Sequence, residues 1–361
     1  MHIAVDAREL VGRPTGVGRY LSCLLEQWAG SGQARRHRFT LFAHHVVPSP
    51  PAPLDVTHVL LPGGGGTRWE QGTLAAALRR ARPDVLFAPG YTAPVMGPAP
   101  IALAVPDVSF VVHPEWFSWR EGVRRRLVTR WSARRAQVVL TFSRFSRDEI
   151  VRRLGVDATR VRVIPLGLGL PRHAARADGP SRRPLVLFVG SIFNRRHVDA
   201  LVRAMPVVLR QVPDAQLAVV GDNRTWPRFD PAALADELDL SSRVSVAAFV
   251  DDARLRSLYA EASAFAFLSE YEGFGLTPLE ALAAGVPPVV LDTPVAREVY
   301  GNAAAFVAAP DPVLIGEALS AVLSESEERR RILAESPDVL ARYRWEDAAA
   351  ATLTALEEAA G

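Results

Sequence analysis

Short apolar segments of strand length alternate with amphipathic segments of helix length along almost the whole chain. This alternation is typical of parallel sheets whose strands are joined by crossover helices, so the predicted fold class is α/β. In the first half, strands are predicted at 2–5, 38–42, 57–61, 85–88, 101–105, 138–142 and 161–165, and helices at 17–28, 69–81, 116–134 and 146–154.

The alternation stops at 171–184, a stretch of Ala, Arg, Gly and Pro without apolar periodicity, which predicts an interdomain linker. We therefore expect two Rossmann-like, doubly wound domains at 1–170 and 185–344, followed by an alanine-rich helix at 345–361. Ligands of such sheets bind at the carboxyl ends of the strands, so a cleft between the two sheets is expected. The second domain has predicted strands at 185–189, 216–220, 244–248, 264–268 and 288–291.

The most informative motif follows the apolar run at 264–268. Gly273 and Gly275 fall in a turn between that strand and a predicted helix, where backbone amides and a helix N-terminus can hold a phosphate. Glu272 lies in the turn and Glu280 lies in the helix. Two carboxylates beside an anion cradle suit a ligand with phosphates and hydroxyls, such as a sugar nucleotide. The alternative is a solvated glutamate pair on an ordinary crossover.

A second strand end carries positive charge. Gly190 and Ser191 follow the strand at 185–189, and Arg195 and Arg196 open the next helix. Two guanidinium groups at this position could clamp a diphosphate and stabilise a leaving group. In a chain so rich in arginine they could also be ordinary surface residues, but their sheet edge is the one that carries Glu272, which favours function.

The first domain offers weaker candidates. Gly16 lies in a glycine-containing turn before a helix, but the spacing does not match a dinucleotide fingerprint. Asp107 follows the strand at 101–105, and His113 comes shortly after it. Either side chain could bind a hydroxyl or move a proton, although a lone histidine in a loop is more often a surface residue.

Composition excludes several classes of protein. The net charge is only +3, and the 42 basic residues, all arginine, are largely scattered, which argues against nucleic-acid binding. No His or Cys pair has metal-ligand spacing, so no bound metal is expected. No cofactor is expected either. A single cysteine, no apolar run of membrane-spanning length and no secretory signal predict a cytoplasmic protein.

The predicted helix near 116–135 has two interpretations. Trp116, Val123, Leu127 and Trp131 form an apolar stripe, and most of the arginines lie away from it. The commoner arrangement packs such a stripe into the core. Alternatively, the arginine-rich helix makes peripheral contact with an anionic membrane, which would place the protein at the inner face of the membrane.

These residues resemble the retaining, GT-B-fold glycosyltransferases of family 4, and the bacterial mannosyltransferases among them most of all. The family hallmark is two glutamates separated by seven residues, and the frame at 272–281 reads EGFGLTPLEA. The likeness extends to the segments at 6–8, 15–20, 69–71, 107–116, 143–146 and 188–191.

The resemblance implies transfer of a hexose, of mannose or glucose type, from a GDP- or UDP-linked donor. The acceptor would be a saccharide or a lipid-linked saccharide in surface polysaccharide or glycoconjugate synthesis. It also implies that the last helix packs back on the first domain. The implied catalytic residues are Glu272, Arg195, Arg196 and Asp107, the implied donor-binding residues are Gly16, Gly190, Gly273, Phe274, Gly275, Leu276 and Glu280, and the acceptor candidates are His113, Trp69 and Glu70.

Two positions depart from the family pattern. Arg196 stands where the family usually has lysine, and Pro106 stands where it has a histidine that contacts the outer hydroxyl of the donor sugar. Proline offers no side-chain hydrogen bond and no backbone donor, so donor choice or activity could differ. The rival functions are a sugar-nucleotide epimerase or phosphorylase of the same architecture, and a non-catalytic sugar-nucleotide binding subunit.

Overall fold

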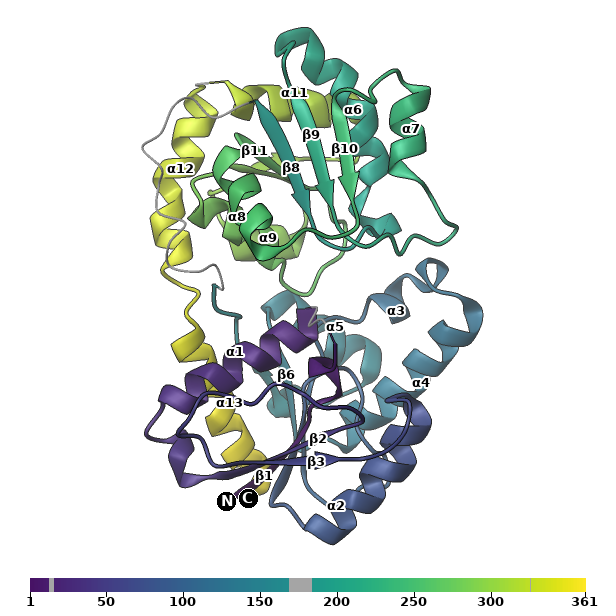
Figure 1. Ribbon diagram of the computed structural model, residues 1–361, viewed down its shortest axis with the longest axis vertical. Coiled ribbons are helices and arrows are strands. Elements are labelled where there is room, and N and C mark those ends of the chain that lie inside the picture. Colours follow the sequence, from purple (N-terminus) through teal and green to yellow (C-terminus); the bar gives the residue numbers. More distant parts are fainter. Residues whose placement is uncertain (13–15, 169–183, 325) are drawn as a thin grey trace. The chain divides into compact units, whose positions relative to one another are not determined.

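The computed structural model describes residues 1–12, 16–168, 184–324 and 326–361 (Figure 1). The chain divides into two compact units. The N-terminal unit comprises Met1–Pro114, Trp119–Gly167 and Tyr343–Gly361, and the C-terminal unit comprises Leu168–Arg342 and Glu115–Ser118. Except for Pro184, the predicted linker at 171–184 lies outside the described residues, as does Thr15 at the start of the 15–20 segment.

The described part of the N-terminal unit contains a seven-stranded parallel sheet in the order β3-β2-β1-β4-β5-β6-β7. Its strands are β1 (His2–Asp6), β2 (Arg38–Ala43), β3 (Val56–Leu60), β4 (Val85–Ala88), β5 (Ile101–Ala104), β6 (Val138–Thr141) and β7 (Val161–Val163). Its helices include η1 (Arg8–Leu10), α1 (Gly16–Gly30), η2 (Ala34–Arg36), η3 (Trp69–Leu74), α2 (Ala75–Ala81), α3 (Ser109–Val112), α4 (Trp119–Arg135), α5 (Arg144–Leu154), η5 (Ala158–Arg160) and α13 (Trp345–Ala360).

The C-terminal unit repeats the scheme with a six-stranded parallel sheet among its described residues, in the order β10-β9-β8-β11-β12-β13. Its strands are β8 (Leu185–Val189), β9 (Gln216–Val220), β10 (Val244–Ala247), β11 (Ala264–Phe267), β12 (Pro288–Leu291) and β13 (Ala305–Val307). Its helices are η6 (Asn194–Arg196), α6 (Val198–Gln211), α7 (Pro231–Glu237), α8 (Asp252–Glu261), α9 (Leu276–Ala283), α10 (Pro294–Tyr300), α11 (Pro312–Leu323) and α12 (Glu327–Leu340).

The central strands are buried on both faces. Every residue of β4, β5 and β6 is buried in one unit, and every residue of β11 and β12 is buried in the other. Continuous apolar strands of this kind are what helices on both sides of a parallel sheet require. The α/β class and the two doubly wound sheets predicted from the sequence are therefore confirmed.

The last helix belongs to the N-terminal unit. Helix α13, yellow in Figure 1, packs against α1 and against β4, β5 and β6. The buried Trp28 indole of α1 donates a hydrogen bond of 2.9 Å to the Ala349 carbonyl. A Cβ atom added at Gly167 would lie 2.2 Å from the Trp345 backbone nitrogen, so glycine is required where the chain passes the start of this helix.

Helix α4 corrects one expectation about packing. Its buried residues are the small Gly122, Thr129, Ser132 and Ala133. Two positions of the predicted core stripe are instead turned outward, because Leu127 and Trp131 are 49% and 55% exposed. Trp119, outside the predicted stripe, is 78% exposed. The prediction that this stripe packs into the core is therefore wrong for Leu127 and Trp131. Small residues let the helix approach the body of its unit closely, whereas the bulky apolar residues remain at the surface.

Each sheet has one point at which its strand order reverses. In the N-terminal unit this point lies between β1 and β4, and in the C-terminal unit it lies between β8 and β11. The connections leave these neighbouring strands in opposite directions, so their carboxyl ends leave a crevice in which ligands of such sheets bind. Among the strand-end residues picked out in the sequence, Arg195, Arg196 and Glu272 follow β8 and β11 at the second of these points, whereas Asp107 follows β5.

Candidate functional site

In the C-terminal unit, the turn after β8 is shaped by a side chain that crosses it. Gly190 has φ +145°, and a Cβ atom there would lie 2.5 Å from the Arg196 Nη1 atom. The same Nη1 atom donates a hydrogen bond of 2.9 Å to the Ser191 carbonyl. Glycine at 190 therefore makes room for the Arg196 guanidinium group to fold back over the strand end.

The turn after β11 supplies the counter-charge. The Glu272 Oε1 atom accepts hydrogen bonds of 2.9 Å from Arg196 Nε and from Ser269 Oγ. Arg196 Nη2 lies 2.8 Å from the same oxygen, and Arg195 Nε lies 3.6 Å away. We call Arg195, Arg196 and Glu272 the Arg-Glu cluster. Its members come from adjacent strand ends at the reversal point between β8 and β11.

Aromatic rings support the two guanidinium groups. The Arg195 Cζ atom lies 4.6 Å from the centroid of the Phe193 ring, and the Arg196 Cζ atom lies 5.0 Å from that of Phe267. Cation–π contact of this kind stabilises a positive charge that has lost part of its hydration. The side chains are thus held before any ligand arrives.

The electrostatics of the cluster favour an anionic ligand. Burial alone would raise the pKa of the Glu272 carboxyl, but Arg196 and Arg195, with hydrogen bonds from Arg196 and Ser269, outweigh it and hold the pKa below its ordinary value. Glu272 is therefore a carboxylate that neutralises one of the two guanidinium charges. The cluster keeps one excess positive charge, with planar donors whose geometry matches phosphate oxygens.

The motif glycines Gly273 and Gly275 lie immediately before the N-terminus of α9. Gly275 precedes the helix with φ +89°, and a Cβ atom there would lie 2.2 Å from the Tyr300 hydroxyl, which donates a 2.9 Å hydrogen bond to the Gly275 carbonyl. No side chain caps the helix N-terminus at Leu276. Gly273 and Phe274 are buried just before it. This helix end has the form that holds phosphate in other proteins.

Glu280 is held apart from the Arg-Glu cluster. It lies inside α9 and is 2% exposed, and its Oε2 atom accepts a 3.2 Å hydrogen bond from the Tyr259 hydroxyl. The Tyr259 ring stacks on Phe265 of β11. A buried carboxylate fixed in this way can present oxygen to a ligand hydroxyl.

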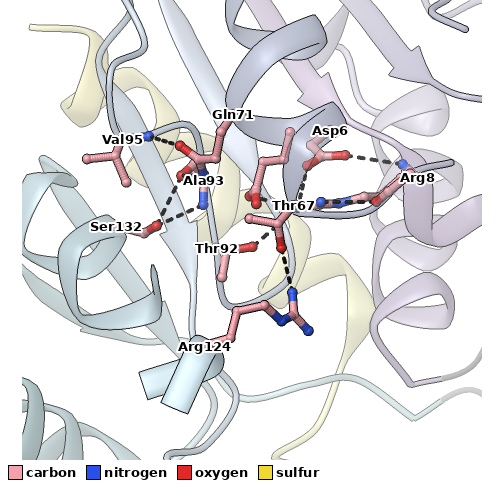
Figure 2. Close-up of polar contacts among 11 residues, drawn as sticks. Asp6, Arg8, Thr67, Gln71, Thr92, Ala93, Val95, Arg124 and Ser132 are labelled. Carbon is pink, nitrogen blue, oxygen red and sulfur yellow. Dashed lines mark hydrogen bonds and ion pairs between the residues drawn. The ribbon is translucent and has the colours of Figure 1, made fainter. Parts of the chain in front are cut away.

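The N-terminal unit has its own charged cluster at the reversal point between β1 and β4. Arg8 Nη2 lies 3.0 Å from Asp6 Oδ2 and 2.8 Å from Glu70 Oε1, and donates to Thr92 Oγ1 over 3.3 Å. Figure 2 shows Arg8 beside Asp6, with Thr92 nearby. Burial raises the pKa of Asp6 to about 6, with Glu70 adding to the rise and Arg8 opposing it. Two carboxylates around one guanidinium group suit a ligand with hydroxyl donors better than an anion.

Two acceptor candidates are interior residues of this cluster. Trp69 and Glu70 are 3% and 1% exposed. The Trp69 indole donates to the Leu61 carbonyl over 3.0 Å, and Glu70 binds Arg8. The next residue, Gln71, fixes the chain at Ala93 and Val95 through both ends of its amide, as Figure 2 shows. The segment therefore positions Arg8 and the 91–95 loop.

The remaining first-unit candidates lie at other places on the same sheet edge. Asp107 is 7% exposed and accepts hydrogen bonds from the Tyr91 hydroxyl (3.0 Å) and the Ser109 amide (2.8 Å). His113 is half-buried at the end of α3. Gly16 begins α1, and a Cβ atom there would meet nothing within 4 Å, so the fold itself does not require this glycine.

Within 1–12, 16–168, 184–324 and 326–361, no three His, Cys, Asp or Glu side chains gather in a way that could hold a metal ion. In the same ranges, no helix combines the length and the apolar character needed to cross a bilayer.

Several groups that complete these clusters are not among the site residues predicted from the sequence. Ser269 binds Glu272, Phe193 and Tyr300 support the two turns, and Thr92 receives Arg8. Ser269 was detectable, because it is a polar residue close behind a buried strand, as Glu272 is. The aromatic supports carry no such signal, since their partners are distant in the sequence.

The pKa of Glu272 leads to a prediction about stability. Because the folded-state pKa lies below the ordinary 4.5, the carboxylate stabilises the fold above that pH, and this contribution is lost as pH falls through the folded-state value. We expect Glu272→Gln to lower the free energy of unfolding at pH 7 by about 1–3 kcal/mol. Urea unfolding should show the difference from wild type shrinking below pH 4.5. A pH-independent difference, or the same loss in the exposed control Glu237→Gln, would contradict this account.

Comparison with known proteins assigns the family. The sequence family "Glycosyltransferase Family 4" matches residues 14–170, and "Glycosyl transferases group 1" matches residues 172–337. A D-inositol 3-phosphate glycosyltransferase of Xylanimonas cellulosilytica is 30% identical over 245 residues, covering 62% of this chain and 57% of that protein. A GDP-mannose:cellobiosyl-diphosphopolyprenol alpha-mannosyltransferase of Komagataeibacter xylinus is 29% identical over 199 residues, covering 54% and 50%.

These alignments thus span about half of each curated relative. Among solved structures, Anabaena Alr3699/HepE in complex with UDP and glucose has the same fold, with a TM-score of 0.73, 17% identity and 99% of each chain covered. Two family matches in succession and two parallel sheets of the same kind lead to one assignment: this chain belongs to the family 4 glycosyltransferases and has the GT-B fold.

Proposed function

We propose that the protein transfers a hexose, of mannose or glucose type, from a GDP- or UDP-linked donor to a hydroxyl group of a saccharide or lipid-linked saccharide, with retention of configuration. The observation that carries this proposal is the Arg-Glu cluster, which sets two guanidinium groups and one excess positive charge beside the N-terminus of α9. A diphosphate is the ligand that such a site neutralises best. The relative whose name includes GDP-mannose and the neighbour bound to UDP and glucose support the same donor class.

The reaction needs charge stabilisation more than covalent chemistry. As the bond between the sugar and the diphosphate breaks, negative charge develops on the leaving phosphate oxygens. Arg195 and Arg196 stabilise that charge, and Glu272 holds both guanidinium groups in place. Glu280 binds the ribose hydroxyls, and the 273–276 backbone meets the sugar and phosphates. In a front-side displacement, the departing phosphate accepts the proton of the acceptor hydroxyl.

On the acceptor side, we propose that Asp107 and His113 contact the hydroxyl groups. Trp69 and Glu70 act indirectly, by holding Arg8 and the loop at 91–95. The cluster of Asp6, Arg8 and Glu70 has an excess of carboxylate, which suits hydroxyl recognition.

We also propose that turnover needs no metal, because the two arginines supply the positive charge that a divalent ion supplies in other transferases. A single assay separates these ideas from their rivals. Product should form only with donor and acceptor together, and EDTA should leave the rate unchanged. Conversion of donor alone indicates an epimerase, dependence on free phosphate indicates a phosphorylase, and binding without any turnover indicates a binding subunit.

Glu280→Ala tests the donor site. We expect nucleotide affinity to fall by about 1–3 kcal/mol, because buried polar partners lose their hydrogen bonds. Calorimetry with GDP and UDP measures the change, with circular dichroism confirming the fold. The exposed Glu237→Ala variant is the matched control and should bind as wild type does. Unchanged affinity in folded Glu280→Ala would remove this residue from the site.

Pro106 leads to a prediction about donor choice. Its carbonyl accepts a 3.1 Å hydrogen bond from the Ser146 hydroxyl, and its ring offers no donor to a sugar. Because no buried hydrogen-bonding group is left unpaired when the donor lacks its outer hydroxyl, the site should accept 6-deoxy donors about as well as hexose donors. Pro106→His should favour the hexose donor. Competition assays decide the matter. Rejection of the 6-deoxy donor by wild type by about a hundredfold, roughly 3 kcal/mol, would assign the contact to another residue.

We further propose that α4 contacts an anionic membrane surface, which places the enzyme in the cytoplasm at the inner face of that membrane. Trp119, Leu127 and Trp131 are exposed, and the same helix carries exposed arginines at positions 120, 124, 130 and 134. Tryptophan prefers the interfacial region of a bilayer, and arginine is attracted to acidic headgroups. A lipid-linked acceptor would be reached from this position.

Vesicle sedimentation tests the membrane contact. Wild type should bind vesicles with 30% phosphatidylserine and should not bind phosphatidylcholine alone, because the arginines need acidic headgroups, each contributing about 1 kcal/mol. Trp119→Ser combined with Trp131→Ser should weaken binding at least tenfold. The control is Trp226→Ser, which removes an equally exposed tryptophan from the C-terminal unit. Equal binding by all three proteins would rule out α4 as the contact.

A further inference from the structure

A second cationic site lies at the opposite edge of the N-terminal sheet, where β1, β2, β3 and β4 begin. A cavity of about 510 Å³ opens there, and its lining includes the arginines Arg35, Arg36, Arg38 and Arg82 and the aspartates Asp55 and Asp84. The reaction residues described above follow the other ends of the strands. We call this cavity the arginine pocket.

The charges in the arginine pocket are not balanced. Four arginines face two aspartates, and Asp84 Oδ2 is occupied by a 2.6 Å hydrogen bond from the His2 backbone amide. Within the described residues, none of the side chains of Arg35, Arg36, Arg38 and Arg82 takes part in a hydrogen bond or an ion pair. Other exposed arginines of the same chain do pair, as Arg297 does with Asp292 at 2.7 Å.

The walls of the arginine pocket are fixed by contacts behind it. His37 Nε2 lies 3.0 Å from Glu357 Oε1 of α13, and His2 Nε2 lies 2.8 Å from Thr40 Oγ1. Arg82 has φ +45°, which is rare for a residue with a side chain, and its amide donates to the Leu78 carbonyl over 2.9 Å. Burial, together with the charge of Arg38, lowers the pKa of His2, so this ring stays neutral and the guanidinium groups carry the positive charge.

We propose that the arginine pocket binds a ligand with two or more linked phosphate groups, at a site separate from the sugar-nucleotide site. Four guanidinium groups without partners repel one another, and a polyphosphate would relieve that repulsion through paired N–H···O bonds. The cavity is far larger than one phosphate and has the size of a small-molecule site. The ligand is a soluble polyphosphate compound or a phosphorylated lipid headgroup, since both present the same chemistry.

Calorimetry with inorganic pyrophosphate tests the proposal on the full-length protein. Wild type should bind pyrophosphate at two sites, of which Arg196→Ala removes one. Arg36→Ala combined with Arg38→Ala should lower the affinity of the other site for pyrophosphate at least tenfold. Arg203→Ala combined with Arg210→Ala removes two exposed arginines of α6 whose side chains likewise have no partner among the described residues, and should leave both sites intact. Thermal unfolding confirms that each variant is folded.

A conservative variant and a lipid arm complete the test. Arg36→Lys with Arg38→Lys keeps the charge but loses the paired donors, so its affinity should lie between those of wild type and the alanine variant. Sedimentation with vesicles that contain diacylglycerol pyrophosphate, a lipid with two linked phosphates, then identifies the source when it is carried out in the Trp119→Ser and Trp131→Ser background. If vesicle binding is lost only when Arg36→Ala and Arg38→Ala are added, the ligand is a lipid headgroup. If the protein binds pyrophosphate in the pocket but does not bind the vesicles, the ligand is soluble.

The proposal is overturned if wild type binds pyrophosphate only at the site that Arg196→Ala removes. It is also overturned if the Arg203 and Arg210 control weakens binding as much as the pocket variant does, because the attraction would then be a general effect of positive charge. Neither result depends on turnover, so the test is independent of the transferase assay.

Discussion

Parallel strand pairing is the constraint on which both units depend. Because every crossover returns the chain to the same starting edge, the carboxyl ends of all strands in a sheet meet at one edge, and their loops become neighbours. Where the strand order reverses, adjacent loops leave in opposite directions and expose a crevice. The β8 and β11 turns, which carry Arg196 and Glu272, are brought together in this way although 76 residues separate the two side chains.

The charged clusters in the two crevices have net charges of opposite sign. In the C-terminal unit, two guanidinium groups surround Glu272 and leave a positive excess. In the N-terminal unit, the carboxylates of Asp6 and Glu70 surround Arg8 and leave a negative excess. A charge removed from water must be paired, and the surplus that remains after pairing selects the ligand. A diphosphate therefore suits the first cluster and hydroxyl groups suit the second.

The binding properties of the protein surface depend on which exposed arginines form ion pairs. With 42 basic residues against 39 acidic ones, nearly complete pairing is possible in principle. Many exposed arginines do pair, whereas those of the arginine pocket have no partner in the part of the chain that the structure describes. The arginines of α4 lie among exposed tryptophans. Surface pairs contribute little to stability, so a departure from pairing costs little and leaves the charge free to bind another molecule.

The sequence by itself determined the class of the fold and the segments that carry chemistry. Apolar runs of strand length followed by helix signals specify a parallel sheet, and polar residues directly after buried strands, such as Glu272 and Asp107, mark the binding edge. Tertiary structure alone decided which side chains meet. Helical periodicity defines a stripe but not the side that is buried, so only packing revealed that α4 buries Ser132 and exposes Trp131. Likewise, the sequence predicts that Glu70 contacts the acceptor, whereas in the fold its carboxylate accepts a hydrogen bond from Arg8, 62 positions away in the sequence. Long-range contacts of this kind leave no periodic trace in the chain, because they depend on how the elements pack rather than on local spacing.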